Sequence, residues 1–294
     1  MTARPEDRGR LIVQFADHAS QIDCTDAALL ACLAALLRHC RAGPSDPAAL
    51  STSTFEVRPD EGATWLLLKD GCVVDRGFPT PEVVERLIYE VTLALATSCR
   101  TSLVVHGAGL VRGNVGLVLC GESGCGKSTL ATWLTATGSD FLSDELVALG
   151  IDGSAMTGFP RPIVLKSDSA VVGQPWWDPP VPTPIPFPGG RIYLDPEQLR
   201  PNSVRAHAGL RVLVFPRYSP DGPLAIHRLT QAEAAYRLMP RLVNAAILAD
   251  RGFQAVTRLV RAVPAYGLSY TAAAAAVGEL NQLWLDAWDH GPGE

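Results

Sequence analysis

The segment from Val115 to Leu130 constrains the chain more than any other part of the sequence. Gly121, Gly126, Lys127 and Ser128 stand there at the spacing G-x-x-x-x-G-K-S, which is typical of a phosphate-binding loop. Glycine lets backbone N–H groups approach phosphate oxygens, because no Cβ lies in the way. An apolar run precedes the loop, and apolar residues recur at helical spacing after it. The motif therefore predicts a strand, a loop and a helix whose N-terminus faces the phosphates.

The residue types in this loop predict how a nucleotide would be held. Lys127 is expected to place its charge on the β- and γ-phosphates of ATP, and the Ser128 hydroxyl is expected to bind Mg²⁺. The predicted nucleotide contacts are Gly121, Glu122, Ser123, Gly124, Cys125, Gly126, Lys127, Ser128 and Thr129.

The composition narrows the class of protein. Hydrophobic residues make up 47% of the 294 residues, which is ample for a core. The net charge of −5 and the lack of a basic run argue against nucleic-acid or membrane partners. The amino-terminal residues are polar and no apolar run reaches membrane-spanning length, so a cytoplasmic location is expected. The seven cysteines include no C-x-x-C pair and are expected to be reduced thiols.

We expect the chain to divide near residue 100. Residues 1–100 are predicted to form an accessory α+β module in which no chemistry is evident. Its predicted helices begin after Asp26 and at Thr80, and its predicted strands are 11–15, 54–57, 64–68 and 72–74.

Residues 101–294 are predicted to form the phosphate-loop domain, of the α/β class. Its predicted strands are 103–111, 115–120, 141–150 and 210–215, and its C-terminal part is predicted to be helical. Within that part, Thr230 and Glu233 form a capping-box pair, and Val263-Pro264 is expected to end a helix.

Candidate catalytic residues lie on both sides of the loop. Asp144 and Glu145 follow an apolar pair and are expected either to bind Mg²⁺ or to accept the proton of a substrate hydroxyl. A plain turn between strands is the alternative interpretation of the pair. His106 lies in an apolar strand, so a core role and a substrate-facing role both stay open. Candidate cations for phosphate oxygens, with surface charge as the alternative, are Arg161, Lys166 and Arg217.

Residues 174–190 alternate proline with apolar residues, which favours an extended loop and excludes a central strand. One interpretation is a flap over an acceptor site, with Trp176 and Trp177 as substrate contacts. The other is a stiff, partly disordered connection.

His106-Gly107, a hairpin, the phosphate loop and Leu142-Ser143-Asp144-Glu145 together resemble the catalytic domain of HPr kinase/phosphorylase. This resemblance covers roughly residues 101–170. Residues 159–166 and the first hundred are more similar to the HPr-kinase-related proteins of bacteria, some of which phosphorylate a peptide serine in lasso-peptide and other peptide-modification pathways.

The resemblance implies a phosphoenolpyruvate-carboxykinase-like kinase fold, with Asp144 as proton acceptor and Glu145 on the metal side. By analogy with the family, a homo-oligomer is one expected state. Two departures leave HPr as substrate, and the reverse phosphorylase activity, open: Glu145 replaces an aspartate, and Pro160-Arg161-Pro162 replaces a glutamate-rich signature.

These observations predict an ATP-dependent kinase for a serine or threonine hydroxyl of a peptide or small protein, such as a ribosomally made precursor peptide. A small-molecule kinase and a nucleotide-gated binding module with little catalysis are the alternatives. A GTPase and a transporter ATPase are disfavoured, because the N-K-x-D and L-S-G-G-Q motifs do not occur.

Overall fold

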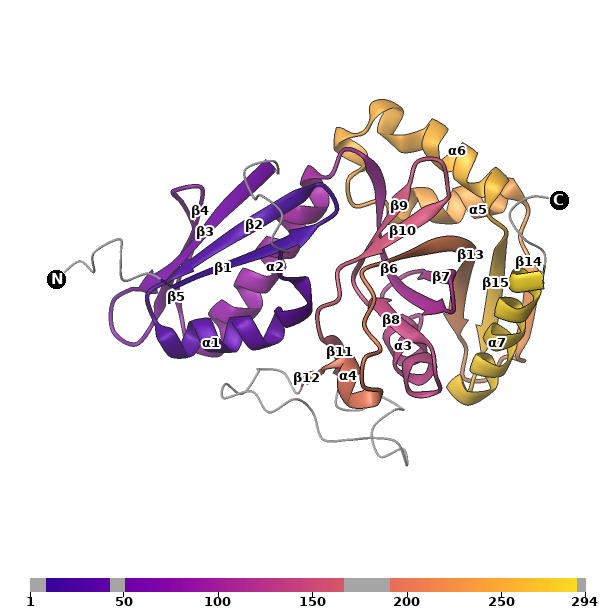
Figure 1. Cartoon of the computed structure of the whole chain (residues 1–294), viewed down its shortest axis with the longest axis horizontal. Coiled ribbons are helices and arrows are strands. Elements are labelled where there is room, and N and C mark those ends of the chain that lie inside the picture. Colours follow the sequence, from indigo (N-terminus) through magenta and orange to yellow (C-terminus); the bar gives the residue numbers. More distant parts are fainter. Residues whose placement is uncertain (1–8, 43–50, 167–190, 290–294) are drawn as a thin grey trace.

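The computed structural model describes residues 9–42, 51–166 and 191–289. It is a mixed α/β structure with one sheet formed before residue 80 and a larger sheet formed after residue 101 (Figure 1). Among the described residues, no helix is both long and apolar enough to cross a lipid bilayer.

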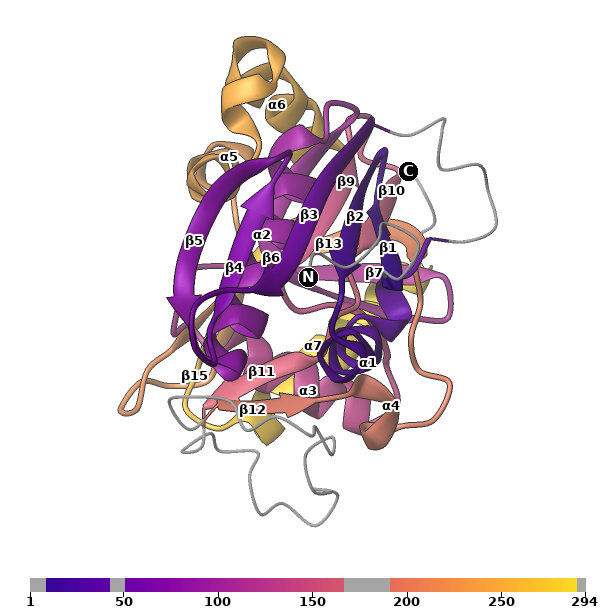
Figure 2. The ribbon, with the colours of Figure 1, turned by 90° about the vertical axis from the view of Figure 1, so that its left-hand side faces the viewer.

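The first sheet has the order β1-β2-β3-β4-β5, and only the β2–β3 pair is parallel. Its strands are β1 (Gly9–Phe15), β2 (His18–Cys24), β3 (Ser51–Pro59), β4 (Trp65–Lys69) and β5 (Cys72–Phe78). Helices α1 (Ala27–Leu36) and α2 (Thr80–Ser98) share a hydrophobic core with this sheet. In Figure 2 the sheet lies in front and α2 behind it.

The predicted helix starts in this part are confirmed. The Asp26 carboxylate accepts a hydrogen bond from the Leu29 backbone N–H at 2.7 Å, as expected of an N-cap. Strand β2 was not predicted. It buries the polar residues His18 and Ser20 beside Ile22, so its apolar alternation is weak in the sequence.

The larger sheet has the order β10-β9-β6-β7-β13-β15-β14, with β8 also paired to β6. Strands β7, β13 and β15 run parallel to one another, so their carboxyl ends meet at one edge. The strands are β6 (Ser102–Arg112), β7 (Val115–Cys120), β8 (Asp140–Ser143), β9 (Leu146–Gly150), β10 (Ala155–Gly158), β13 (His207–Tyr218), β14 (Ala225–Arg228) and β15 (Ala265–Tyr270).

Helices cover both faces of this sheet. All of β7 is buried, and its side chains alternate between two cores: Leu117 and Leu119 face one, Val118 faces the other. Helices α3 (Lys127–Ala136) and α7 (Ala273–Asp289) contribute to the first core. Helices α5 (Gln231–Leu238) and α6 (Phe253–Ala262) contribute to the second.

The remaining elements are short. Strands β11 (Ile163–Lys166) and β12 (Arg191–Leu194) form a two-stranded ribbon, followed by helix α4 (Pro196–Leu199). The single-turn 3₁₀ helices are η2 (Arg38–Cys40), η5 (Met239–Arg241), η6 (Ala245–Ile247) and η7 (Ala249–Gly252).

Two expectations for the second part of the chain are wrong. Residues 141–150 form two strands rather than one, because the Ser143 hydroxyl accepts hydrogen bonds from the backbone N–H groups of Glu145 and Leu146 and turns the chain there. The C-terminal part is not only helical. It supplies β14 and β15, and β15 exists because β13 and β14 pair with it on either side.

Candidate active site

The predicted phosphate loop, residues 121–126, connects β7 to α3 at the edge where the parallel strands end. Gly124 and Gly126 have φ angles of +83° and +94°, a backbone conformation that residues with a Cβ rarely adopt. Gly126 is the N-cap of α3 and provides no side-chain capping bond. The first N–H groups of α3 therefore keep their capacity to bind an anion such as a phosphate.

The Lys127 side chain lies folded back over this loop. Only 6% of the residue is exposed, and its ammonium donates hydrogen bonds of 3.0 Å to the backbone carbonyls of Gly121 and Glu122. These bonds hold the positive charge beside the loop that would receive phosphates. The other predicted nucleotide contacts lie on the same stretch: Glu122, Ser123 and Gly124 are exposed, and Cys125, Gly126, Ser128 and Thr129 are half-buried.

Tyr270, at the end of β15, supports the loop from beneath. Its hydroxyl donates a 3.3 Å hydrogen bond to the Cys125 carbonyl, and its ring packs edge-on against Tyr218 with 5.7 Å between centroids. A Cβ added to Gly126 would lie 1.7 Å from the Tyr270 hydroxyl oxygen. Gly126 is thus required by both its backbone angle and its neighbour.

Gly126→Ala is expected to lower both thermal stability and nucleotide affinity. The left-handed backbone alone costs about 1–2 kcal/mol, and the collision with Tyr270 adds to it. Gly138→Ala is the matched control, because Gly138 has φ +113° but open space around its Cβ position. The difference in melting temperature between Gly126→Ala and Gly138→Ala measures the destabilisation caused by the contact with Tyr270. Equal melting temperatures would contradict the predicted contact.

Asp144 stands in the turn between β8 and β9, behind the loop. It is 8% exposed, and one of its carboxylate oxygens, Oδ1, has no hydrogen-bond partner among the described residues. Burial raises the pKa of the Asp144 carboxyl to about 7, against the opposing hydrogen bond with Ser128 at the start of α3. A carboxyl group that titrates near neutrality beside a phosphate loop is suited to proton transfer.

Glu145 has the opposite environment. Burial disfavours its charged form, but the hydrogen bond from His106 and the positive charge of Arg161 prevail and lower the pKa of Glu145 to about 2. The His106 Nδ1 lies 3.4 Å from Oε1, and the Arg161 guanidinium is paired with Oε2. Adjacent carboxyl groups with separated pKa values are typical of divided acid–base roles. Here the pKa of Glu145 is lowered and that of Asp144 is raised.

The other predicted site residues lie on different elements of the fold. His106 is on β6, which pairs directly with the phosphate-loop strand, and its side chain is 41% exposed rather than in the core. Arg217 is exposed at the carboxyl end of β13, beside β7. Lys166 is exposed at the end of β11. Trp176 and Trp177 lie outside the described residues.

Arg241, which is not among the residues predicted from the sequence, also reaches the loop. It lies in the 3₁₀ turn η5, and its guanidinium donates a 2.8 Å hydrogen bond to the Glu122 carboxylate. The two residues are 119 positions apart. No local pattern marks Arg241, because only the packing of the segment after α5 brings it to the loop.

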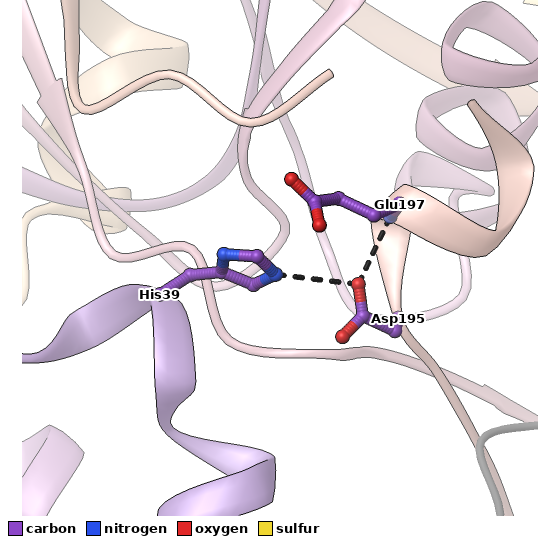
Figure 3. A group of neighbouring side chains, drawn as sticks. All are labelled: His39, Asp195 and Glu197. Atoms are coloured by element: carbon purple, nitrogen blue, oxygen red, sulfur yellow. Dashed lines mark hydrogen bonds and ion pairs between the residues drawn. The ribbon is translucent and has the colours of Figure 1, made fainter. Parts of the chain in front are cut away.

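His39, Asp195 and Glu197 form a second group of potential metal ligands, with ligand atoms within 4.8 Å of one another (Figure 3). Arg38 already pairs with both of its carboxylates: its Nε lies 2.8 Å from Asp195 Oδ2 and its Nη2 lies 3.0 Å from Glu197 Oε2. We interpret the group as an ion-pair network that joins η2 to α4.

A cavity of about 990 Å³ lies away from the phosphate loop. It is lined at the amino ends of β13 and β15 by residues that include Arg211 and Tyr266, whereas the loop is at the carboxyl ends of these strands. The cavity and the candidate active site are therefore separate.

No protein-family model matches the chain, and no curated protein matches it. Among solved structures, the chain is similar to the Hpr(Ser) kinase/phosphatase from Coxiella burnetii, with a TM-score of 0.33 and 12% sequence identity. The match covers 62% of this chain and 97% of that chain. At this level the similarity carries no inference about activity.

Proposed function

We propose that this chain is an ATP-dependent kinase that transfers the γ-phosphoryl group to a serine or threonine hydroxyl of a peptide or small protein. The observation that carries the proposal is the buried Asp144 carboxyl, with one oxygen unpartnered among the described residues, beside Ser128 at the start of α3. A phosphate loop without such a carboxyl group accounts for nucleotide binding but supplies no proton acceptor. With it, the site has a proton acceptor where the phosphates would end.

The loop and its cations would hold the triphosphate. Backbone N–H groups at the start of α3 bind phosphate oxygens, and Lys127 exchanges its carbonyl partners for them. Arg241 is a second cation at the loop, and its partner Glu122 is exposed, so the guanidinium can turn toward the nucleotide. Arg217 stands at the adjacent strand end.

The donor set fits a magnesium ion. Ser128 offers a hydroxyl oxygen and Asp144 a carboxylate oxygen that has no other described partner, and oxygen ligands are those that Mg²⁺ prefers. Glu145, held ionised by Arg161 and His106, adds a negative charge on the same side. When bound, the ion neutralises charge on the β- and γ-phosphates.

Asp144 would carry out the proton transfer. Its carboxylate accepts the proton of the acceptor hydroxyl as the new bond forms between that oxygen and the γ-phosphorus. The bond from the γ-phosphorus to the bridging oxygen breaks, and ADP leaves with its electron pair. Positioned proton acceptors contribute roughly 10²–10⁴-fold to such rates.

A peptide or protein acceptor is favoured by the exposure of the loop. Glu122, Ser123 and Gly124 are exposed, and the first sheet adds a module that phosphate binding does not require. An acceptor residue on a flexible segment can reach such a site without full enclosure.

The test is incubation of the purified chain with Mg-ATP and peptides encoded by genes neighbouring its own, followed by intact-mass detection. We expect a mass gain of one phosphoryl group, located on serine or threonine by fragmentation. Nucleotide binding with phosphorylation only of small hydroxyl compounds would replace the proposal with a small-molecule kinase. Binding without any transfer would replace it with a nucleotide-gated module.

Arg241→Gln is expected to raise the KM for ATP roughly ten-fold, because a phosphate-facing charge is lost. Thermal stability should change little, since the Glu122 side chain is 79% exposed and ion pairs with an exposed partner contribute about 0–1 kcal/mol. Arg228→Gln, at an exposed position on β14, is the control. An unchanged KM in the Arg241 variant would remove Arg241 from the nucleotide site.

A further inference from the structure

Arg161 lies on an irregular segment that connects β10 to β11. The backbone of this segment is anchored at Phe159, whose N–H donates to the Leu146 carbonyl at 3.2 Å and whose carbonyl accepts from the Ser143 hydroxyl at 3.1 Å. The Arg161 N–H then donates to the Phe159 carbonyl at 2.9 Å. The position of the Arg161 guanidinium beside Glu145 therefore depends on where Phe159 is held.

The side chain of Phe159 is held by the first part of the chain. Phe159 is fully buried, and its ring packs edge-on against Phe15 at the end of β1, with 5.9 Å between centroids and 73° between planes. The core around it consists mainly of residues from the first sheet, α1 and α2. Leu146, next to the acidic pair, belongs to the same core.

Polar contacts hold the ribbon beyond Arg161 from the same side. On β12, the Tyr193 hydroxyl is hydrogen-bonded to the Glu85 carboxylate of α2 at 2.9 Å, and Arg191 lies 3.5 Å from the same carboxylate. After β12, His39 contacts Asp195 at 3.3 Å (Figure 3). Arg38 pairs with the same carboxylate at 2.8 Å. The first sheet and its helices, the amino-terminal module, thus contact the chain at three places: before β11, on β12 and just after β12.

We propose that the amino-terminal module is a positioning element of the active site, in which Phe15 holds Phe159 and thereby keeps Arg161 against Glu145. Phe15 is a positioning residue and touches neither nucleotide nor acceptor. The kinetic consequence rests on the proposed function, whereas the placement of Arg161 does not.

Loss of this support is expected to slow transfer without weakening nucleotide binding. The phosphate loop has no part in the Phe15–Phe159 contact, so the affinity for Mg-ATP should stay unchanged. A displaced Arg161 would leave Glu145 with His106 as its remaining partner. Small displacements of positioned groups reduce rates by up to roughly 10²-fold, and we expect a loss of roughly ten-fold in kcat.

The experiment compares Phe15→Leu with Phe55→Leu in the full chain. Phe55 is also fully buried in the first sheet, but its ring faces the Lys69 ammonium, 5.8 Å from the ring centroid. Hydrogen exchange of the Gly158, Phe159 and Arg161 amides is measured first, because it needs no activity. We expect faster exchange there for Phe15→Leu and not for Phe55→Leu. Equal exchange in both variants would overturn the placement. If Phe15→Leu does not fold, Phe159→Leu is used in its place, because it removes the other ring of the same Phe15–Phe159 contact.

A double-mutant cycle then separates positioning from general destabilisation. Phe15→Leu should lower kcat in the otherwise native chain and cause no further loss in the Arg161→Gln background. An equal loss in both backgrounds would overturn the role of Arg161 as the link. If the native chain phosphorylates nothing, the proposed function fails, and hydrogen exchange still decides whether the module holds Arg161.

Discussion

Replacing Lys127 with alanine is expected to reduce phosphoryl transfer by at least roughly 10²–10³-fold, the loss typical for one group that stabilises developing charge. The ammonium is the buried positive charge of the loop, within 3.0 Å of two loop carbonyls. In the proposed function, this charge would move onto the β- and γ-phosphates of bound nucleotide, where negative charge shifts during transfer. Alanine supplies neither the charge nor a donor for the carbonyls of Gly121 and Glu122.

The measurement is single-turnover transfer at saturating Mg-ATP, with circular dichroism to establish that the variant is folded. Lys127→Met keeps most of the side-chain volume and should lose the same activity, which separates charge from packing. Lys69→Ala, in the first sheet, is the control for loss of a lysine. A folded Lys127 variant with near-native transfer would refute the phosphate-loop assignment.

Asp144→Asn is expected to lower transfer by roughly 10²–10⁴-fold, because the amide keeps the shape of the carboxyl but cannot accept the hydroxyl proton. Nucleotide affinity measured without magnesium should be unchanged, since the loop and Lys127 are unchanged. Asp221→Asn, at an exposed loop position, is the matched control. Full turnover by the Asp144 variant at saturating nucleotide would exclude Asp144 as the proton acceptor.

The pH dependence gives an independent check on Asp144. Its pKa is raised to about 7 by burial, so the form that accepts protons becomes dominant only above neutrality. Transfer by the native chain should therefore rise with pH through the pKa of Asp144, which bound Mg²⁺ lowers from about 7, and residual transfer by Asp144→Asn should lack this rise.

The free energy of unfolding should fall as pH rises, whereas transfer should increase. Between the usual aspartate pKa of 3.8 and about 7 the folded state binds more protons than the unfolded state, so this carboxyl makes the fold less stable as pH rises. Unfolding free energies measured across this range should converge for the native chain and the Asn variant at low pH. Above pH 7 the native chain should be the less stable of the two. A constant difference would contradict the raised pKa.

Local sequence patterns predicted the elements whose conformation is set by residues close together in the sequence. The glycine spacing and apolar run predicted β7, its loop and the start of α3, because φ angles and strand burial are properties of consecutive residues. The Asp26 cap and the Thr230–Glu233 capping box were predicted for the same reason, since a cap spans only a few positions.

Tertiary structure alone decided which charges meet. Glu145 obtains His106 and Arg161 from separate strands and loops, and Arg241 reaches Glu122 across 119 positions. Strand β15 owes its conformation to pairing on both sides, which its own sequence does not specify.

Tertiary structure also decided the environments of Asp144 and Glu145. The sequence of Asp144 and Glu145 shows two adjacent carboxyl groups, but burial of one and pairing of the other separate their pKa values by several units. The contact between Phe15 and Phe159 likewise joins residues from the two sheets. Such contacts form only when the chain has closed long loops, so no short-range pattern in the sequence records them.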